Sequence, residues 1–170
     1  MEDKRSESPG PAHATTVERT SDREVVISRV ISGPAHLVFE AWTRPELFRQ
    51  WWVPKSSGLT LVSCEIDARV GGGYRLVFVY GDSAPMAFHG RYLEVTPGAR
   101  LVWTNEEAGD AGQLSTVTFE EHNGRTKVVL RELYPSKEAL DADLEAGSLP
   151  CSNETFEQLD ALLAGTTATA

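Results

Sequence analysis

Between residues 59 and 134 the chain alternates apolar and polar positions in short runs, which is the pattern of half-buried β-strands. Turn-forming pairs such as Gly81-Asp82, Pro97-Gly98 and Asn123-Gly124 separate neighbouring runs. The six runs are residues 59–66, 72–82, 86–95, 99–106, 114–122 and 126–134. Because their connections are short, we predict six successive strands in an antiparallel meander.

A strand and two short helices are predicted before the meander. Residues 23–31 are rich in β-branched side chains and are followed by a Gly33-Pro34 break. The next segment repeats apolar residues at helical spacing, at Leu37, Val38, Ala41 and Trp42. Pro45 interrupts this pattern, and a proline ends one helix and suits the first turn of another.

The pattern is helical again after the meander. Ser136 is a suitable N-cap for a helix that stops at Gly147. In residues 148–165 one stripe carries the apolar and small side chains Cys151, Thr155, Phe156, Leu159, Leu162 and Leu163. Two arrangements fit: two helices, with Pro150 in the first turn of the second, or one helix kinked at Pro150.

These elements predict an α+β fold in which a long C-terminal helix packs on a curved antiparallel sheet. The helix is the only long amphipathic element left to cover the apolar face of the sheet. A curved sheet around one helix leaves space between them for a small apolar ligand. We expect one domain at residues 23–165. Residues 1–22 are polar and aperiodic, so we predict a disordered tail there and a short second tail at 166–170.

Composition excludes several classes of function. A net charge of -9 argues against a nucleic-acid surface, which needs clustered Lys and Arg. No apolar run approaches the ~20 residues that span a bilayer, and no secretory signal is visible, so we expect a cytoplasmic protein without a membrane span. Cys64 and Cys151 form neither a disulfide framework nor a metal spacing. We expect no metal and no cofactor.

No catalytic constellation is visible. His13, His36, His89 and His122 are isolated from one another and from the cysteines. No G-x-S-x-G turn marks a nucleophilic serine, and the triple glycine at residues 71–73 lacks the Lys-Ser/Thr of a phosphate-binding loop. His89, inside a predicted strand, is the best candidate for proton transfer, although strand histidines are more often structural or exposed.

Large apolar side chains on the strands are the candidate ligand-binding residues. In the strand at 72–82, the side chains of Tyr74, Leu76, Phe78 and Tyr80 share one face. Plain core packing is an alternative for any single residue, but so many rings facing one helix favour a cavity. The candidate set is Trp52, Leu76, Phe78, Tyr80, Phe88, His89, Trp103, Phe119, Cys151 and Phe156. Cys151 is included as a small apolar residue, not as a reactive thiol.

Two adjacent tryptophans, Trp51 and Trp52, follow the second predicted helix. Neighbouring side chains on a regular element point in different directions, so one surface cannot bury both rings. We predict that Trp51 packs the helix pair onto the sheet and that Trp52 faces the ligand.

The sequence resembles the START-like, or helix-grip, superfamily. It is most similar to the branch named for the homologue of the activator of the ninety-kilodalton heat-shock chaperone's ATPase. The resemblance covers residues 24–164, and the matching sequence segments are residues 41–54, 64–76, 90–104, 115–121 and 133–147. Two positions depart from the family pattern. Val53 stands where the family usually has glycine. Cys151-Ser152-Asn153 stands where the last helix of the family often begins with Gly-Trp-Ser or a similar motif. Both departures bear on the mouth of the groove.

The resemblance implies a hydrophobic small molecule as partner, held by a monomer or weak homodimer. Two other functions remain open. One is a cyclase or hydrolase in which His89, Tyr80 or an arginine transfers protons. The other is an interaction module for a chaperone.

Overall fold

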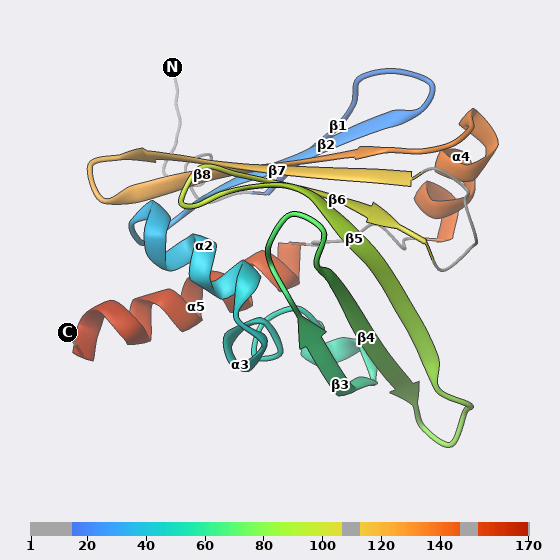
Figure 1. Ribbon diagram of the computed structural model, residues 1–170, viewed down its shortest axis with the longest axis horizontal. Coiled ribbons are helices and arrows are strands. Elements are labelled where there is room, and N and C mark those ends of the chain that lie inside the picture. The colour runs from blue at the N-terminus through green and yellow to red at the C-terminus, as the bar shows by residue number, and fades with distance from the viewer. Residues whose placement is uncertain (1–14, 107–112, 147–152, 170) are drawn as a thin grey trace, which may run out of the picture.

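The computed structural model describes residues 15–106, 113–146 and 153–169, and these form an α+β fold (Figure 1). The strands are β1 (Thr16–Arg19), β2 (Glu24–Ile31), β3 (Leu59–Ile66), β4 (Gly73–Tyr80), β5 (Met86–Thr96), β6 (Arg100–Asn105), β7 (Gln113–His122) and β8 (Arg125–Leu133). The helices are α2 (Ala35–Thr43), α3 (Pro45–Phe48), the 3₁₀ helix η1 (Lys55–Ser57), α4 (Lys137–Ala146) and α5 (Asn153–Thr169). The predicted helix-grip order is confirmed, with the strands in the sheet order β1-β2-β8-β7-β6-β5-β4-β3.

The predicted tails need two corrections. Residues 16–19 form β1, which pairs with β2 from Thr16 opposite Ser28 to Arg19 opposite Val25. All four side chains of β1 are exposed, so the strand buries no apolar stripe that a sequence pattern could reveal. At the other end, α5 continues through Gly165 to Thr169. Glycine often ends a helix, but inside one it costs only about 1 kcal/mol relative to alanine.

Two smaller expectations are confirmed by the local geometry. Asn123 and Gly124 have φ angles of 56° and 78°, as a two-residue turn between β7 and β8 requires. The hydroxyl of Ser136 accepts a hydrogen bond from the N–H of Ala139 at 3.1 Å, so Ser136 caps α4. The question of a break at residues 147–150 lies outside the described residues.

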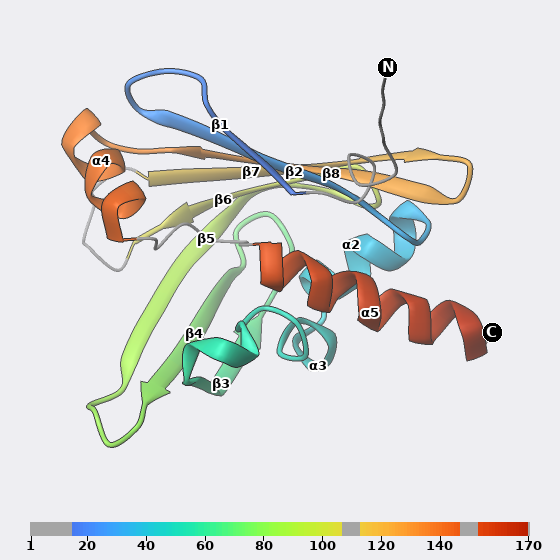
Figure 2. The same ribbon diagram turned by 180° about the vertical axis from the view of Figure 1, so that it is seen from behind.

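The sheet bends where β5 passes from β4 to β6. The first half of β5 pairs with β4, the second half with β6, and the register shifts between Tyr92 and Glu94. Gly90 lies at this bend, where a Cβ atom would be 1.8 Å from the carbonyl oxygen of Thr104. Only glycine therefore allows this approach of β5 to β6. As a result, β3 and β4 turn away from the rest of the sheet (Figures 1 and 2).

The main core lies between the sheet, α2 and α5 (Figure 2). From α5, Phe156, Leu159 and Leu163 are at most 2% exposed. From α2, Val38 and Ala41 are fully buried. Burying a large apolar side chain contributes about 1.5–3 kcal/mol, so this contact is what fixes α5 on the sheet.

The predicted division between the two tryptophans is confirmed for Trp51, and its cause is Pro45. In a continuous helix the carbonyl of Ala41 would accept the N–H of residue 45, but proline has none. The indole Nε1 of Trp51 donates to that carbonyl at 2.9 Å instead, and the Trp51 side chain is fully buried. Trp51 thus satisfies the end of α2, and the less buried ring of Trp52 lies edge to face against it at 5.4 Å.

Candidate functional site

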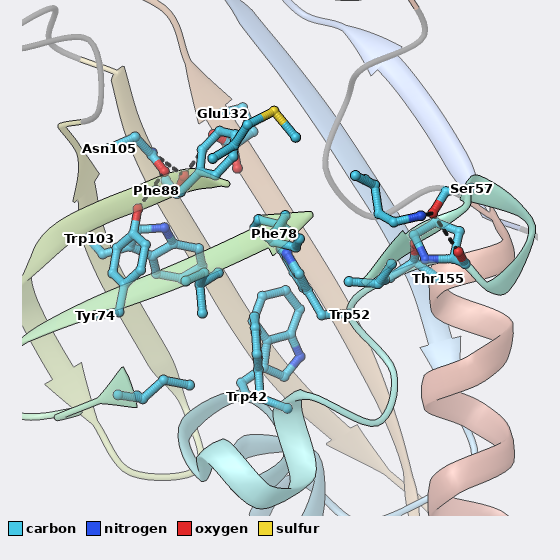
Figure 3. Close-up of a pocket in the computed structure, with 18 of the residues that line it drawn as sticks. Trp42, Trp52, Ser57, Tyr74, Phe78, Phe88, Trp103, Asn105, Glu132 and Thr155 are labelled. Carbon is cyan, nitrogen blue, oxygen red and sulfur yellow. Dashed lines mark hydrogen bonds between the residues drawn. The ribbon is translucent and has the colours of Figure 1, made fainter. Parts of the chain in front are cut away.

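A cavity of about 650 Å³ lies between the bent half of the sheet, the segment after α3 and the start of α5 (Figure 3). Its walls combine β3, β4 and β5 with the ends of β6, β7 and β8. The size is within the range of sites that enclose a small organic molecule. The bend at Gly90 shapes this space, because it turns β3 and β4 out of the plane of β7 and β8, so that the two halves of the sheet form two walls of the cavity.

One side of the cavity is an aromatic wall. Trp52 stacks on Phe48 with ring centroids 4.7 Å apart, and Trp42 lies 5.8 Å from Trp52 and 6.0 Å from Trp103. Phe78 and Phe88 meet edge to face at 5.4 Å on β4 and β5. Phe88 is 38% exposed and lies at the rim. These rings offer apolar surface to a flat or branched hydrocarbon.

Half of the predicted ligand-binding residues line this cavity, namely Trp52, Leu76, Phe78, Phe88 and Trp103. Four others lie elsewhere. Tyr80 is 56% exposed at the end of β4, and His89 points to solvent from β5. Phe119 is buried against Phe39 of α2, with centroids 5.7 Å apart, and Phe156 lies in the core.

The misplacements have simple causes. Phe119 lies on the predicted face of the sheet, but helix α2 covers that part of β7. Phe156 belongs to the α5 stripe that packs on the sheet, and its neighbour Thr155 lines the cavity instead. Cys151 lies outside the described residues.

The inner end of the cavity is polar, which the sequence analysis missed. Glu132 is 2% exposed, and its Oε1 accepts hydrogen bonds from the Ser115 hydroxyl at 2.7 Å and from Gln113 Nε2 at 3.1 Å. Asn105 Nδ2 donates to the Ser115 oxygen at 2.8 Å, and the Tyr74 hydroxyl donates to Asn105 Oδ1 at 2.9 Å (Figure 3). A signal was present in the sequence: Glu132 continues the buried phase of Val128 and Leu130.

The charges that line the cavity are all negative among the described residues. Glu132, Asp143 and Glu154 contribute carboxylates, and the described lining includes no Lys, Arg or His. Asp143 accepts a hydrogen bond from the Tyr134 hydroxyl at 2.8 Å. Burial first, and then Asp143 and Glu132, raise the pKa of Tyr134, so this phenol stays protonated. Burial likewise raises the pKa of Tyr92 in the cavity wall.

The segment that carries Trp52 is attached to α5 by two polar side chains. Gln158 Nε2 donates to the carbonyls of Trp51 and Val53 at 2.9 and 2.8 Å, and its Oε1 accepts the N–H of Lys55 at 2.9 Å. Glu154 accepts hydrogen bonds from both the N–H and the hydroxyl of Ser56. Val53, which replaces the usual family glycine, lines the cavity beside Trp52.

Other chemistry has little support in the described part of the chain. No group of three His, Cys, Asp or Glu side chains within residues 15–106, 113–146 and 153–169 is arranged to hold a metal ion. Arg91 of β5 is exposed and pairs with Glu106 at 2.7 Å. None of the helices among these residues is long and apolar enough to cross a bilayer.

The model of one protein family matches residues 32–164, and its description is "Activator of Hsp90 ATPase homolog 1-like protein". No curated protein matches the chain.

Solved bacterial structures share the fold. A protein of Rhodobacter sphaeroides is 21% identical with a TM-score of 0.78, over 89% of this chain and 98% of that one. A protein of Nitrosomonas europaea is 24% identical with a TM-score of 0.77, over 88% and 99%. A protein of Chromobacterium violaceum is 27% identical with a TM-score of 0.68, over 82% and 96%.

Proposed function

Because the chain belongs to the family of Activator of Hsp90 ATPase homolog 1-like proteins, within the START-like superfamily, we propose that it binds a small apolar or aromatic molecule in the cavity. One observation carries this proposal: a cavity of about 650 Å³ that is lined on one side by aromatic rings from the sheet and from the segment after α3. Plain core packing would fill that space with side chains, since protein interiors are close-packed.

Binding is favoured over turnover by the positions of the two residues that the sequence suggested for proton transfer. His89 and Tyr80, the residues first considered for proton transfer, are exposed outside the cavity. A general acid or base must lie within hydrogen-bonding reach of the reacting atom. A cyclase or hydrolase using this cavity would therefore need other groups than those two.

The test is binding of Nile red, an uncharged dye whose emission shifts to the blue in apolar surroundings. We expect saturable binding to the wild type and a loss of at least tenfold in affinity in Leu76→Trp, which extends a ring into the cavity from β4. Arg75→Trp is the matched control, because Arg75 is exposed on the opposite face of the same strand.

Absence of a saturable dye signal, or equal affinity in both variants, would contradict the proposal. An interaction module for a chaperone would then be the better interpretation of the family membership.

A further inference from the structure

One hydroxyl in the cavity wall has a proton to donate and no acceptor for it among the described residues. It belongs to Tyr92 of β5, whose side chain is 5% exposed and lines the cavity. We infer that the ligand carries a neutral acceptor oxygen, such as that of a ketone, and that the Tyr92 hydroxyl donates a hydrogen bond to it. This inference rests on the binding function proposed above and specifies the class of ligand.

The tyrosines in and beside the cavity differ in their hydrogen bonds. The hydroxyl of Tyr74 donates to Asn105 Oδ1 at 2.9 Å, and that of Tyr134 donates to Asp143 at 2.8 Å. The hydroxyl of Tyr92 makes no hydrogen bond to the part of the chain that the structure describes. Because buried tyrosine hydroxyls usually find a partner, an unpaired one in a cavity wall indicates a position for a ligand atom.

The Tyr92 hydroxyl can be reached from the cavity. Among the described residues, the unpaired side-chain atoms that protein encloses completely are Arg29 Nε and Trp42 Nε1. The Tyr92 oxygen is not one of them, so part of its surface is open where Tyr92 lines the cavity. Burial first, and then the nearby Cys64 and Asp67, raise the pKa of this phenol, which therefore keeps its proton at neutral pH. The hydroxyl is thus available as a donor.

A second unpaired donor lies beside the first. Trp103 of β6 is directly opposite Tyr92 in the sheet, and the two ring centroids are 6.3 Å apart. Its indole Nε1 has no hydrogen-bond partner within the described segments, and protein does not enclose it completely. An indole N–H can only donate, whereas a carbonyl oxygen has two lone pairs and accepts from more than one donor. These two side chains therefore favour an acceptor on the ligand.

The charge of the lining distinguishes a neutral acceptor from an anionic one. The described lining includes no Lys, Arg or His, and the chain has a net charge of -9. A ligand carboxylate would be buried there without a cation, which costs far more than burying a neutral carbonyl that accepts a hydrogen bond. The ligand class is therefore an apolar molecule with a neutral carbonyl group, whose body lies against the aromatic wall.

The experiment compares three probes that share a naphthalene body and differ in one substituent. They are the ketone 2-acetylnaphthalene, the isosteric hydrocarbon 2-isopropenylnaphthalene, and the anion 2-naphthoate. Each is measured at neutral pH by displacement of Nile red, whose own affinity is determined for every variant. We expect 2-naphthoate to bind about tenfold or more weakly than the ketone, because its charge has no partner in the cavity.

Two variants assign the hydrogen bond to one hydroxyl. Tyr92→Phe should weaken binding of the ketone about 3- to 10-fold and change that of the hydrocarbon by less than about twofold, since it removes a donor and leaves the ring. Its midpoint of urea unfolding should equal that of the wild type, because the hydroxyl has no partner in the described part of the protein. Tyr80→Phe is the matched control, because it makes the same change on a ring that is 56% exposed outside the cavity. It should leave all three affinities unchanged.

Infrared spectroscopy gives a direct readout of the hydrogen bond. Donation to a carbonyl oxygen weakens the C=O bond and lowers its stretching frequency. With a carbon-13 label at the carbonyl, bound 2-acetylnaphthalene should absorb at a lower frequency in the wild type than in Tyr92→Phe.

The possible failures are distinguishable. If Tyr92→Phe weakens the ketone and the hydrocarbon equally, or leaves the ketone affinity and its carbonyl frequency unchanged, the inference is wrong and the binding function stands. Binding of 2-naphthoate as tight as that of the ketone would overturn the neutral acceptor. If Nile red itself shows no saturable binding, the proposed function fails. Should Tyr92→Phe not fold, the carbonyl frequency in the wild type decides, because an unbonded ketone would absorb as it does in a hydrocarbon solvent.

Discussion

At residue 51 an indole N–H takes the place of a main-chain N–H that proline lacks. The bond from Trp51 Nε1 to the carbonyl of Ala41 explains why a tryptophan follows the second helix at this distance. Trp42 offers a contrast within the same cluster. It is 2% exposed, but its Nε1 has no hydrogen-bond partner among the described residues. Two buried tryptophans in edge-to-face contact at 4.9 Å therefore have different polar roles.

This contrast predicts unequal losses of stability on replacement by phenylalanine. Both variants lose similar apolar contacts, but Trp51→Phe also leaves the Ala41 carbonyl without its donor. An unsatisfied buried group costs about 1–3 kcal/mol, so we expect Trp51→Phe to be more destabilising than Trp42→Phe by about 1–2 kcal/mol. Urea unfolding followed by circular dichroism measures the difference. Equal losses would show that the hydrogen bond contributes nothing net.

At single positions, sequence analysis succeeded where one pattern decided the environment. The adjacency of Trp51 and Trp52 predicted different environments for the two rings, and the structure has Trp51 in the core and Trp52 in the cavity wall. The two rings nevertheless stay in edge-to-face contact, with centroids 5.4 Å apart. It failed at Glu132 because a glutamate in a strand is normally assigned to the solvent face. The alternation with Val128 and Leu130 was the stronger signal.

Among the elements, α5 has two functions that the sequence pattern did not separate. Its apolar stripe packs on the sheet, which the helical spacing predicted. Its polar residues Glu154 and Gln158 hold the segment with η1, which no periodicity reveals. Contacts of side chains with the main chain of a distant loop depend on the tertiary fold and leave no local trace in the sequence. The strand β1 was missed for a related reason, since it is stabilised through main-chain pairing.

Removal of the Gln158 side chain should therefore loosen one wall of the cavity without unfolding the molecule. Gln158→Ala removes three hydrogen bonds to residues 51–55, each worth about 0.5–1.5 kcal/mol. We expect faster amide hydrogen exchange at residues 53–57 and weaker Nile red binding.

The control for this prediction lies one residue away. Glu157→Ala changes an exposed side chain of the same helix and should leave exchange at residues 53–57 as in the wild type. If both variants accelerate exchange equally, the effect comes from α5 as a whole and not from Gln158.

In the whole molecule, a single bend in the sheet shapes the cavity. The strand order and the antiparallel pairing could be predicted from runs and turns, but the bend depends on the 1.8 Å approach that only Gly90 permits, and that is a tertiary contact. The sequence analysis accordingly predicted a cavity between the sheet and the C-terminal helix, but it did not predict that one end of the cavity is polar. Residues from β4, β6, β7 and β8 meet there only because the sheet bends.

A ligand in this cavity should stabilise the entire fold, because it contacts both halves of the bent sheet. At about 100 times its dissociation constant, Nile red should raise the free energy of unfolding by about 2.7 kcal/mol. The midpoint of urea unfolding, followed by circular dichroism, measures this change. Leu76→Trp should show a much smaller shift, and a shift of wild-type size in that variant would place the binding site outside the cavity.

The hydrogen bond between Trp51 and Ala41 also links the residues that evolution can accept at positions 45 and 51. While residue 45 is proline, the carbonyl of Ala41 requires the indole. A mutation at residue 45 that restores a main-chain N–H would replace the indole only if Arg44, which is extended at φ -98° and ψ 121°, also became helical. Among diverging descendants, we therefore expect loss of Trp51 chiefly in chains that have also lost Pro45 and continue the helix through residue 44.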